Sequence, residues 1–395
     1  MKYSSLTDRL APLGGQKWQV YELARRMASA GQDIIELTIG ESDVPTPGFL
    51  IEEACSALRR GRTGYSEGRG ELKLRRALAE RYSQQLGYFV TEGQILCFPG
   101  TQTALYAVIR GIVEAGDEVL VGDPMYATYE GVIASSGATV VPVPLPPEAG
   151  FRMQVKDVEE KITGNTQAIL LNTPHNPTGV VSTAEEIRQI GDLAKQHDLW
   201  LIVDEVYEEL VFSGASFFSP LSFEDLVDRV VVVSSISKSW AAPGFRSGWC
   251  VASEDFCNRL VPLLETMLFG NQPFIADMTA LAVSRHSGTA QAMARRFEKR
   301  SDILIQRLHE NTGLKVHKPD AGMFALIDIS STGINGHDYA MDLLKRQGVA
   351  VMPGNAFGES LVNWVRVALT IDDKIFIQAC DRIIAYENMR KSVAV

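Results

Sequence analysis

The amino-acid sequence predicts an α/β protein in which helices cover both faces of a mostly parallel sheet, with a smaller α+β unit beside it. Two observations support this fold class. Short runs rich in β-branched residues alternate with helical patterns over about 200 residues, and several runs are apolar at every position, as in strands that are covered on both faces. Beyond residue 285 the alternation stops, which indicates a second unit.

Seven runs are expected to form the larger sheet. Each is short and is followed by turn residues, which is typical of strands in βαβ units. The runs are QILCF (94–98), EVLVG (118–122), TVVPV (139–143), AILLN (168–172), LWLIVDE (199–205), RVVVVSS (229–235) and GWCVA (248–252). Between them, 101–113 and 184–197 place their apolar residues on one helical stripe. We assign the second helix a capping box formed by Ser182 and Glu185.

Two domains are expected, because 395 residues exceed what one compact core usually holds. We place the larger domain at 46–284. The smaller domain is predicted to combine 1–45 with 285–395, which contains a long charged helix and the apolar runs AGMFALIDI, GVAVMPG and WVRVALT. The boundary is expected to be a helix, since the sequence has no flexible linker there.

Composition restricts the partners and the compartment. The formal net charge of −10 argues against a general nucleic-acid or anionic-membrane partner. No apolar run is long enough to span a bilayer, and the N-terminal stretch lacks the hydrophobic core of a signal peptide. Five dispersed cysteines indicate reduced thiols in a cytoplasmic protein, and six histidines without paired spacing predict no metal site.

Four predicted strand ends carry polar residues that a core does not need. Ligands of open parallel sheets bind at the carboxyl ends of the strands, so these residues are expected to meet at one edge. Taken singly, each has an ordinary explanation, such as a turn, a helix cap or a solvated loop lysine. They are Gly100, Thr101 and Gln102 in PGTQ, Asn176 in TPHNPTG, Asp204 and Tyr207 in DEVY, and Ser235, Lys238 and Arg246 in SSISKSWAAPGFRSGW.

Pyridoxal phosphate is a cofactor that needs this whole set of groups. Its aldehyde needs an amine, which Lys238 can supply. Its pyridine nitrogen needs a carboxylate in order to stay protonated and act as an electron sink. Its phosphate needs a helix N-terminus and a fixed cation, and Arg246 can supply the charge. The residues therefore predict a site for this cofactor at the sheet edge.

The ordered motifs resemble those of the class I/II pyridoxal-phosphate aminotransferases, the aspartate aminotransferase superfamily. The match runs over nearly the whole chain and is carried by LTIGESD, YSEGRG, GTQTAL, NTPHNPTG, DEVY, SISKSWAAPGFRSGW and VRVALT in that order. The resemblance implies fold type I, with a seven-stranded large domain and a small α+β domain. It also implies ping-pong transfer of the α-amino group of an L-amino acid to a 2-oxo acid, in a homodimer that shares its active sites.

The resemblance implies a role for each candidate residue. Lys238 would bind the aldehyde and move protons, and Asp204, which begins the family's Asp-x-x-Tyr pattern, would hold the ring nitrogen. The other implied cofactor contacts are Tyr207 and Asn176 at the phenolic oxygen, Tyr126 on the ring face, Gly100, Thr101, Gln102, Ser235 and Arg246 at the phosphate, and Tyr65 lent to the phosphate by the neighbouring subunit. The implied substrate contacts are Arg366 and Gly40 at the α-carboxylate, with Asn176 and Trp18 nearby.

The amino-acid donor is predicted only by class. One bacterial branch of the resembling aspartate aminotransferases has a lysine in its GGK loop, which meets the distal carboxylate of the substrate. Here that position is Gln102, so neutral, aromatic or basic donors are expected. The motifs also resemble the bacterial arginine–pyruvate aminotransferases. Two other functions share the scaffold and stay open as alternatives: a carbon–sulfur β-lyase and a non-catalytic ligand sensor.

Overall fold

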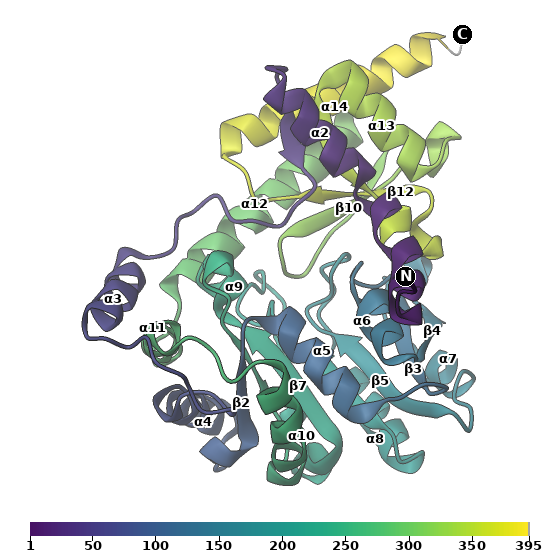
Figure 1. Cartoon of the computed structure of the whole chain (residues 1–395). Coiled ribbons are helices and arrows are strands. Elements are labelled where there is room, and N and C mark those ends of the chain that lie inside the picture. Colours follow the sequence, from purple (N-terminus) through teal and green to yellow (C-terminus); the bar gives the residue numbers. More distant parts are fainter. Residues whose placement is uncertain (394–395) are drawn as a thin grey trace.

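In the computed structural model of the chain, which describes residues 1–393, the strands form two separate sheets (Figure 1). The seven predicted runs all form strands of the larger sheet, which confirms the predicted fold class. Its strands, in spatial order, are β2 (Ile95–Phe98), β8 (Gly248–Val251), β7 (Val230–Ser235), β6 (Trp200–Asp204), β5 (Thr166–Asn172), β3 (Glu118–Asp123) and β4 (Thr139–Pro144). Strand β8 runs antiparallel to both of its neighbours, and the other neighbouring pairs are parallel.

Both faces of the larger sheet are buried. In β7, Val230 and Val232 pack with one group of helices, and Val231 and Val233 pack with another. All four side chains are inaccessible to solvent. Because successive side chains of a strand point to opposite faces, this alternation requires a helical layer on each side. Burial of each valine stabilises the fold by roughly 1.5–3 kcal/mol.

Each helical layer combines helices from several parts of the chain, and the two sets interleave along the sequence. One consists of α3 (Gly48–Arg59), α4 (Leu72–Leu86), α8 (Ala184–Gln196) and α11 (Pro273–Val283). The other consists of α5 (Thr101–Ile112), α6 (Tyr129–Ser136) and α10 (Glu254–Met267). The remaining helices of this part are the short α1 (Ser5–Leu10), α7 (Val155–Glu159) and α9 (Ile236–Ser239). Within residues 1–393, no helix is long and apolar enough to cross a membrane.

The second sheet joins the two ends of the chain. Its order is β1 (Ile35–Leu37), β11 (Val349–Pro353), β12 (Trp364–Ala368), β10 (Phe324–Asp328) and β9 (Lys315–His317). The helices packed with it are α2 (Gln19–Ser29), α12 (Gly288–Asn311), α13 (Gly336–Gln347) and α14 (Asp373–Val393), at the top of Figure 1. Strand β1 pairs in parallel with β11, which places the N-terminal segment on the C-terminal unit. The domain boundaries at 46–284 stay a prediction.

The capping box of α8 lies one residue later than predicted. The side chain of Thr183 accepts a hydrogen bond from the backbone N–H of Glu186, and the Glu186 carboxylate accepts one from the N–H of Thr183. The motif fits the sequence in two registers, because a second glutamate follows Glu185. Ser182 is still tied to the preceding loop, since its N–H donates to Thr173 Oγ1 at 3.0 Å. The assignment to Ser182 and Glu185 was therefore wrong.

The corrected cap predicts which substitution destabilises α8. Thr183→Ala should lower the free energy of unfolding of this region by about 1 kcal/mol, because it leaves an N-terminal amide without its acceptor. Ser182→Ala is the matched control and should have less than half of that effect, since no capping bond involves its hydroxyl. Amide hydrogen exchange in the first turn of α8 measures both. Equal protection in the two variants would contradict the assignment.

Candidate active site

A cavity of about 220 Å³ lies where the carboxyl edge of the larger sheet faces the smaller sheet. Side chains from both sheets line it. The expected site residues among them are Trp18, Gly40, Thr101, Gln102, Tyr126, Asn176, Asp204, Tyr207, Lys238, Arg246 and Arg366. Residues that are far apart in the sequence thus meet in one cavity, as the positions at the strand ends predicted.

Three expected residues do not line the cavity. Gly100 lies behind it as the N-cap of α5, in contact with Arg246. Ser235 is buried, and its hydroxyl accepts a hydrogen bond from the N–H of Ser237, which does line the cavity. Tyr65 is 90% exposed on the surface, so within one chain it cannot contribute to this cavity.

Asp204 is the carboxylate that faces the cavity. Its Oδ2 accepts a hydrogen bond from Tyr129 Oη at 2.8 Å, and its Oδ1 accepts one from the N–H of Val206 at 3.1 Å. Glu205 points to the other side of the strand, where Ser219 Oγ donates to its Oε1 at 2.7 Å. Burial raises the pKa of Asp204 to about 6, although the Tyr129 hydroxyl opposes that shift.

Lys238 lies in the cavity at the C-terminal end of the short helix α9. Its Nζ donates to the carbonyl oxygen of Gly40 at 2.7 Å. Burial lowers the pKa of Lys238 to about 8, and the positive charges of Arg366 and Arg246 act in the same direction. Roughly a tenth of the amine is therefore uncharged at pH 7, far more than for an ordinary lysine, and the uncharged form is the one that attacks a carbonyl carbon or accepts a proton.

A hydrogen-bonded chain links the cavity residues of β5, β6 and β12. Asn172, at the end of β5, donates from Nδ2 to the carbonyl oxygen of Asp204 at 2.9 Å. Its Oδ1 accepts the N–H of Asn176 at 2.8 Å. The Oδ1 of Asn176 in turn accepts a hydrogen bond from Arg366 Nη1 at 2.9 Å, and its Nδ2 donates to Tyr207 Oη at 3.5 Å. The amide of Asn176 is thereby held in one orientation.

Arg366 is a buried cation held by neutral partners. Its Nη2 donates to the carbonyl oxygen of Thr38 at 2.5 Å, while Nε is buried without a partner. The guanidinium carbon lies 3.7 Å from the ring centre of Phe324 and 4.4 Å from that of Phe357, so two aromatic faces stabilise the charge. Burial nevertheless lowers the pKa of Arg366 to about 10. This arrangement suits a planar carboxylate ligand.

The N-terminus of α5 and Arg246 form a potential anion site. Arg246 has a left-handed backbone (φ 53°), and its Nη1 and Nη2 donate to the carbonyl oxygens of Pro243 and Pro99 at 2.8 and 3.3 Å. The hydroxyl oxygen of Thr101 is buried without a partner. Gly100 has φ 91°, and a Cβ there would lie 2.3 Å from Arg246 Nη2. Only glycine lets the arginine approach the helix start, where backbone N–H groups attract anions.

Among the described residues, the only cations that line the cavity are Lys238, Arg246 and Arg366. The Gln102 side chain also lines the cavity and accepts a hydrogen bond from Thr128 Oγ1 at 3.0 Å. The nearest basic residue in the sequence to Trp18 is Lys17, whose Nζ is paired with Glu130 at 2.9 Å. A carboxylate on the side chain of a substrate would therefore meet an amide and an indole ring rather than an ammonium group.

Five polar or aromatic residues that line the cavity were missed by the sequence interpretation. They are Tyr129, Asn172, Ser237, Phe324 and Phe357. Asn172 closes a buried strand, and its position was a signal that could have found it. The roles of the two phenylalanines could not be seen, because they depend on packing between residues distant in the sequence. His175 is no catalytic candidate, since its ring is hydrogen-bonded to Thr178 Oγ1 at 2.7 Å and burial lowers its pKa to about 4.

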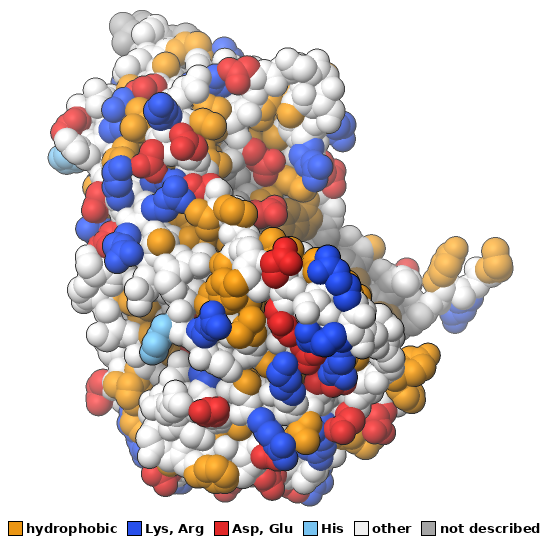
Figure 2. Space-filling model, turned by 90° about the vertical axis from the view of Figure 1, so that its left-hand side faces the viewer, with side chains coloured by type: hydrophobic (Ala, Val, Ile, Leu, Met, Phe, Trp, Pro, Cys, Tyr) orange, Lys and Arg blue, Asp and Glu red, His pale blue; other side chains and the backbone are white. Residues whose placement is uncertain are grey.

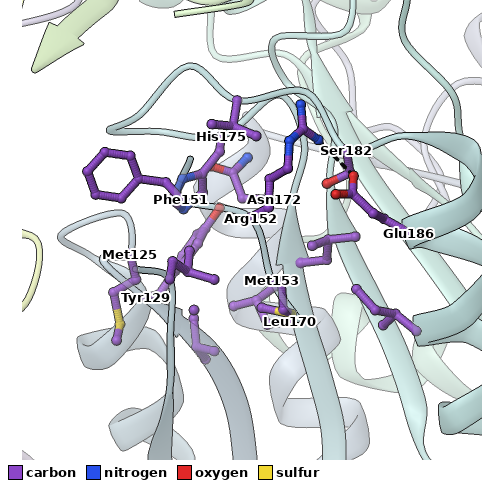
Figure 3. A pocket seen from close by; sticks show the side chains of 16 residues that line it. Met125, Tyr129, Phe151, Arg152, Met153, Leu170, Asn172, His175, Ser182 and Glu186 are labelled. Carbon is purple, nitrogen blue, oxygen red and sulfur yellow. Dashed lines mark hydrogen bonds and ion pairs between the residues drawn. The ribbon is translucent and has the colours of Figure 1, made fainter. Parts of the chain in front are cut away.

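A second, smaller cavity of about 30 Å³ lies behind Tyr129 and Asn172 (Figure 3). Its lining is mainly apolar, with Met153 and Leu170 among the residues labelled in the figure. The ion pair between Arg152 Nη1 and Glu186 Oε2, 2.8 Å long, lies at one side. At this size it holds about one water molecule, so it is not a second ligand site.

Comparison with known proteins assigns the family. A family model described as aminotransferase class I and II matches residues 32–383. The chain belongs to this family. It is therefore a pyridoxal-phosphate-dependent aminotransferase that transfers the α-amino group of an L-amino acid to a 2-oxo acid. The carbon–sulfur β-lyase alternative is not favoured, because the relatives are aminotransferases.

The similarity of this aminotransferase to its relatives extends over more than nine-tenths of the chain. An arginine–pyruvate transaminase of Pseudomonas aeruginosa is 39% identical over 383 residues, which cover 97% of each chain. A probable aspartate/prephenate aminotransferase of Aquifex aeolicus is 32% identical over 91% of this chain and 92% of its own length. The structure of a Thermus thermophilus aspartate aminotransferase double mutant has a TM-score of 0.91 at 29% identity, covering 98% of this chain and 99% of that one.

The residues of this aminotransferase fit pyridoxal phosphate. The buried hydroxyl of Thr101 has no hydrogen-bond partner, and the missing side chain of Gly100 lets Arg246 lie beside the start of α5. Together these groups provide an anion site. Asp204, in the same cavity, is a carboxylate that suits a protonated ring nitrogen, and Lys238 is an amine with a lowered pKa. The donor set therefore matches the chemistry of the cofactor group by group.

The close contact at Gly100 predicts a selective loss of cofactor binding. Gly100→Ala should raise the dissociation constant of pyridoxal phosphate at least about tenfold, because the methyl group would displace the Arg246 guanidinium, the cation expected to hold the phosphate. Gly87→Ala is the matched control, since Gly87 also has a positive φ (78°) but its Cβ would meet nothing within 4 Å. Fluorescence titration of the two apo-proteins measures the constants. Similar constants in both variants would show that the contact does not matter.

Proposed function

We propose that the cavity residues divide the amino-transfer reaction among them as follows. Lys238 would hold the aldehyde of the cofactor through its Nζ, and the same atom would take up and return the proton of the substrate α-carbon. Asp204 holds the ring nitrogen, and Tyr126 covers the ring. Asn176 and Tyr207 bind the phenolic oxygen. Thr101, Gln102, Arg246 and the helix capped by Gly100 bind the phosphate, with Ser235 supporting the loop through Ser237.

The electrostatics of the cavity support this division. When bound, pyridoxal phosphate supplies an aldehyde for the amino group and a cationic ring that accepts an electron pair. Lys238 Nζ, with a pKa of about 8, can take a proton near neutral pH and return it. Asp204, with a pKa of about 6, is mostly ionised there. The one observation that carries the proposal is that these two groups line the same cavity at the carboxyl edge of the sheet.

Arg366 is proposed to bind the α-carboxylate of the substrate, with Gly40 and Asn176 beside it. Its Nε is buried and unpartnered, so a carboxylate would supply the acceptor that is missing. A Cβ on Gly40 would lie 2.4 Å from the ring of Phe324, one of the two rings that contact the guanidinium. Glycine at this position thus lets the N-terminal segment close over the arginine.

We propose that the preferred donor is an L-amino acid without a side-chain carboxylate, and that arginine with pyruvate as acceptor is the first pair to test. Lys238, Arg246 and Arg366 are the only cations that line the cavity among the described residues, and each has another role. Gln102 and Trp18 offer no charge to a distal carboxylate. The relative named as an arginine–pyruvate transaminase supports arginine.

A cytoplasmic homodimer that shares its active sites is also proposed. Tyr65 is 90% exposed and contacts the ring of Phe269, itself 62% exposed, with 5.7 Å between ring centres. Helix α3, at the left of Figure 1, exposes Phe49, Ile51 and Leu58. Figure 2 turns that side toward the viewer and shows hydrophobic side chains among acidic and basic ones. A second copy that covered this face would bury these side chains and bring Tyr65 to its phosphate site.

Donor preference tests the proposed substrate class. With pyruvate as acceptor, kcat/KM for arginine should exceed that for aspartate at least about tenfold, since a distal carboxylate would lose its water without gaining a cation. Gln102→Lys should raise kcat/KM for aspartate about tenfold or more and lower it for arginine. Gln102→Met is the uncharged control and should not favour aspartate. A wild-type preference for aspartate or glutamate would contradict the proposal.

Subunit hybrids test the shared site. Lys238→Ala should be inactive, and Tyr65→Ala should bind the cofactor weakly. Mixing the two variants under conditions of subunit exchange should restore activity above that of either alone, because one site of each hybrid then contains both native residues. Tyr65→Ala exchanged with itself is the control. Equal activity in mixture and control, or full wild-type activity of a monomer in sedimentation, would overturn the proposed dimer.

A further inference from the structure

Tyr129 is the one polar side chain that contacts the Asp204 carboxylate directly within the described residues. It is the first residue of α6, on the opposite side of the larger sheet from α8, and is 2% exposed. Its Oη donates to Asp204 Oδ2 at 2.8 Å. No motif of the sequence singled it out, and the division of roles proposed above leaves it without a function.

The position of Tyr129 is itself fixed by packing. Its ring packs edge to face against Tyr126, with 5.4 Å between ring centres and an interplanar angle of 81°. On the other side it forms a wall of the small cavity, near Asn172 in Figure 3. The hydroxyl therefore has one accessible acceptor in a site that is closed on both sides. A tyrosine held this way can act as a rigid donor.

We propose that Tyr129 is a positioning residue for the amino-transfer reaction: its hydroxyl holds the Asp204 carboxylate in a single orientation toward the cavity. The Tyr129 hydroxyl donates to Oδ2 and the N–H of Val206 donates to Oδ1, so each carboxylate oxygen has one fixed hydrogen-bond donor. The remaining lone pairs are left to meet the ring nitrogen. The inference rests on the proposed role of Asp204 and extends it to the group behind that carboxylate.

The hydrogen bond also affects protonation. A donor to the ionised carboxylate stabilises that form, so Tyr129 lowers a pKa that burial raises to about 6. Loss of the hydroxyl would move the pKa of Asp204 further up, and the ionised form would then be lost at a higher pH. The other titratable groups that interact electrostatically with Asp204 are Tyr126, Tyr207, Lys238 and, from the opposite side of the strand, Glu205. Of these, Lys238 lowers the pKa of Asp204, as Tyr129 does.

Tyr129→Phe is the first variant to test, because it removes only the hydroxyl. We expect kcat to fall about tenfold to a hundredfold, as for loss of a hydrogen bond to a charged group. The KM for the amino donor should change less than about threefold, because Tyr129 does not contact the substrate side chain. In the apo-protein, cofactor binding should weaken, and the pH below which binding declines should move upward by about one unit.

A matched control exists in the smaller domain. Tyr386 is fully buried, and its Oη donates to Asp342 Oδ2 at 2.9 Å, remote from the cavity. Tyr386→Phe should cost comparable thermal stability while it leaves kcat and the pH profile of cofactor binding unchanged. If Tyr129→Phe behaves like Tyr386→Phe in both measurements, the hydroxyl has only a structural role and the proposal is wrong.

A double-mutant cycle separates this proposal from the one on which it rests. If Tyr129 acts through Asp204, Tyr129→Phe should have little further effect on kcat in an Asp204→Asn background. Loss of activity in Asp204→Asn with normal activity in Tyr129→Phe would overturn the role of Tyr129 alone. Full activity in Asp204→Asn would overturn the proposed role of the carboxylate.

A crystal structure of the wild-type holoenzyme decides the matter without any variant. With pyridoxal phosphate bound, Tyr129 Oη should stay within hydrogen-bonding distance of Asp204 Oδ2, roughly 3.2 Å or less. A separation beyond about 3.5 Å, or a carboxylate rotated so that it no longer meets both Tyr129 and the ring, would overturn the proposal even if Tyr129→Phe fails to fold.

Discussion

Desolvation of charged groups at one edge of the larger sheet is the constraint on which the active site depends. Burial raises the pKa of Asp204 to about 6 and lowers those of Lys238 and Arg366 to about 8 and 10. The hydrogen-bond partners of all three are neutral: a tyrosine hydroxyl, amide groups and carbonyl oxygens. Because a buried charge without a counter-charge costs several kcal/mol, a ligand that supplies a cationic ring and a carboxylate relieves an existing penalty.

The same contacts join the two parts of the chain. Lys238, between strands β7 and β8 of the larger sheet, donates to the carbonyl oxygen of Gly40 in the N-terminal segment. Arg366 of the smaller sheet donates to the side chain of Asn176. A substrate carboxylate at Arg366 would compete with Asn176 for the guanidinium, and a cofactor at Lys238 would release Gly40 from its hydrogen bond. Binding at the cavity would therefore be coupled to the contacts between the sheets, as is common where a site lies between two structural units.

The sequence predicted the seven strands of the larger sheet, because continuous apolar runs allow few other structures, and it predicted the edge at which polar residues meet. It could not predict that Tyr129 reaches Asp204, since the two are separated by 75 positions and the contact depends on how α6 packs. It also misplaced the cap of α8, where Ser182 and Thr183 both start a valid motif. Local periodicity fixes which elements form, while side-chain contacts depend on tertiary packing.

Three of the residues assigned to the reaction are buried, whereas the residue assigned to donor specificity is exposed. Asp204, Asn176 and Arg366 are each 4% exposed and belong to the strands or the turns that follow them. Gln102 is exposed at a helix start, where a substitution disturbs no core. Relatives named for arginine, aspartate or aromatic amino acids therefore share this architecture, and solved structures named for the latter two superpose on it with TM-scores of 0.91 and 0.88. Membership of the aminotransferase family assigns the reaction, whereas the donor depends on the side chains that line the cavity, because one fold supports several specificities.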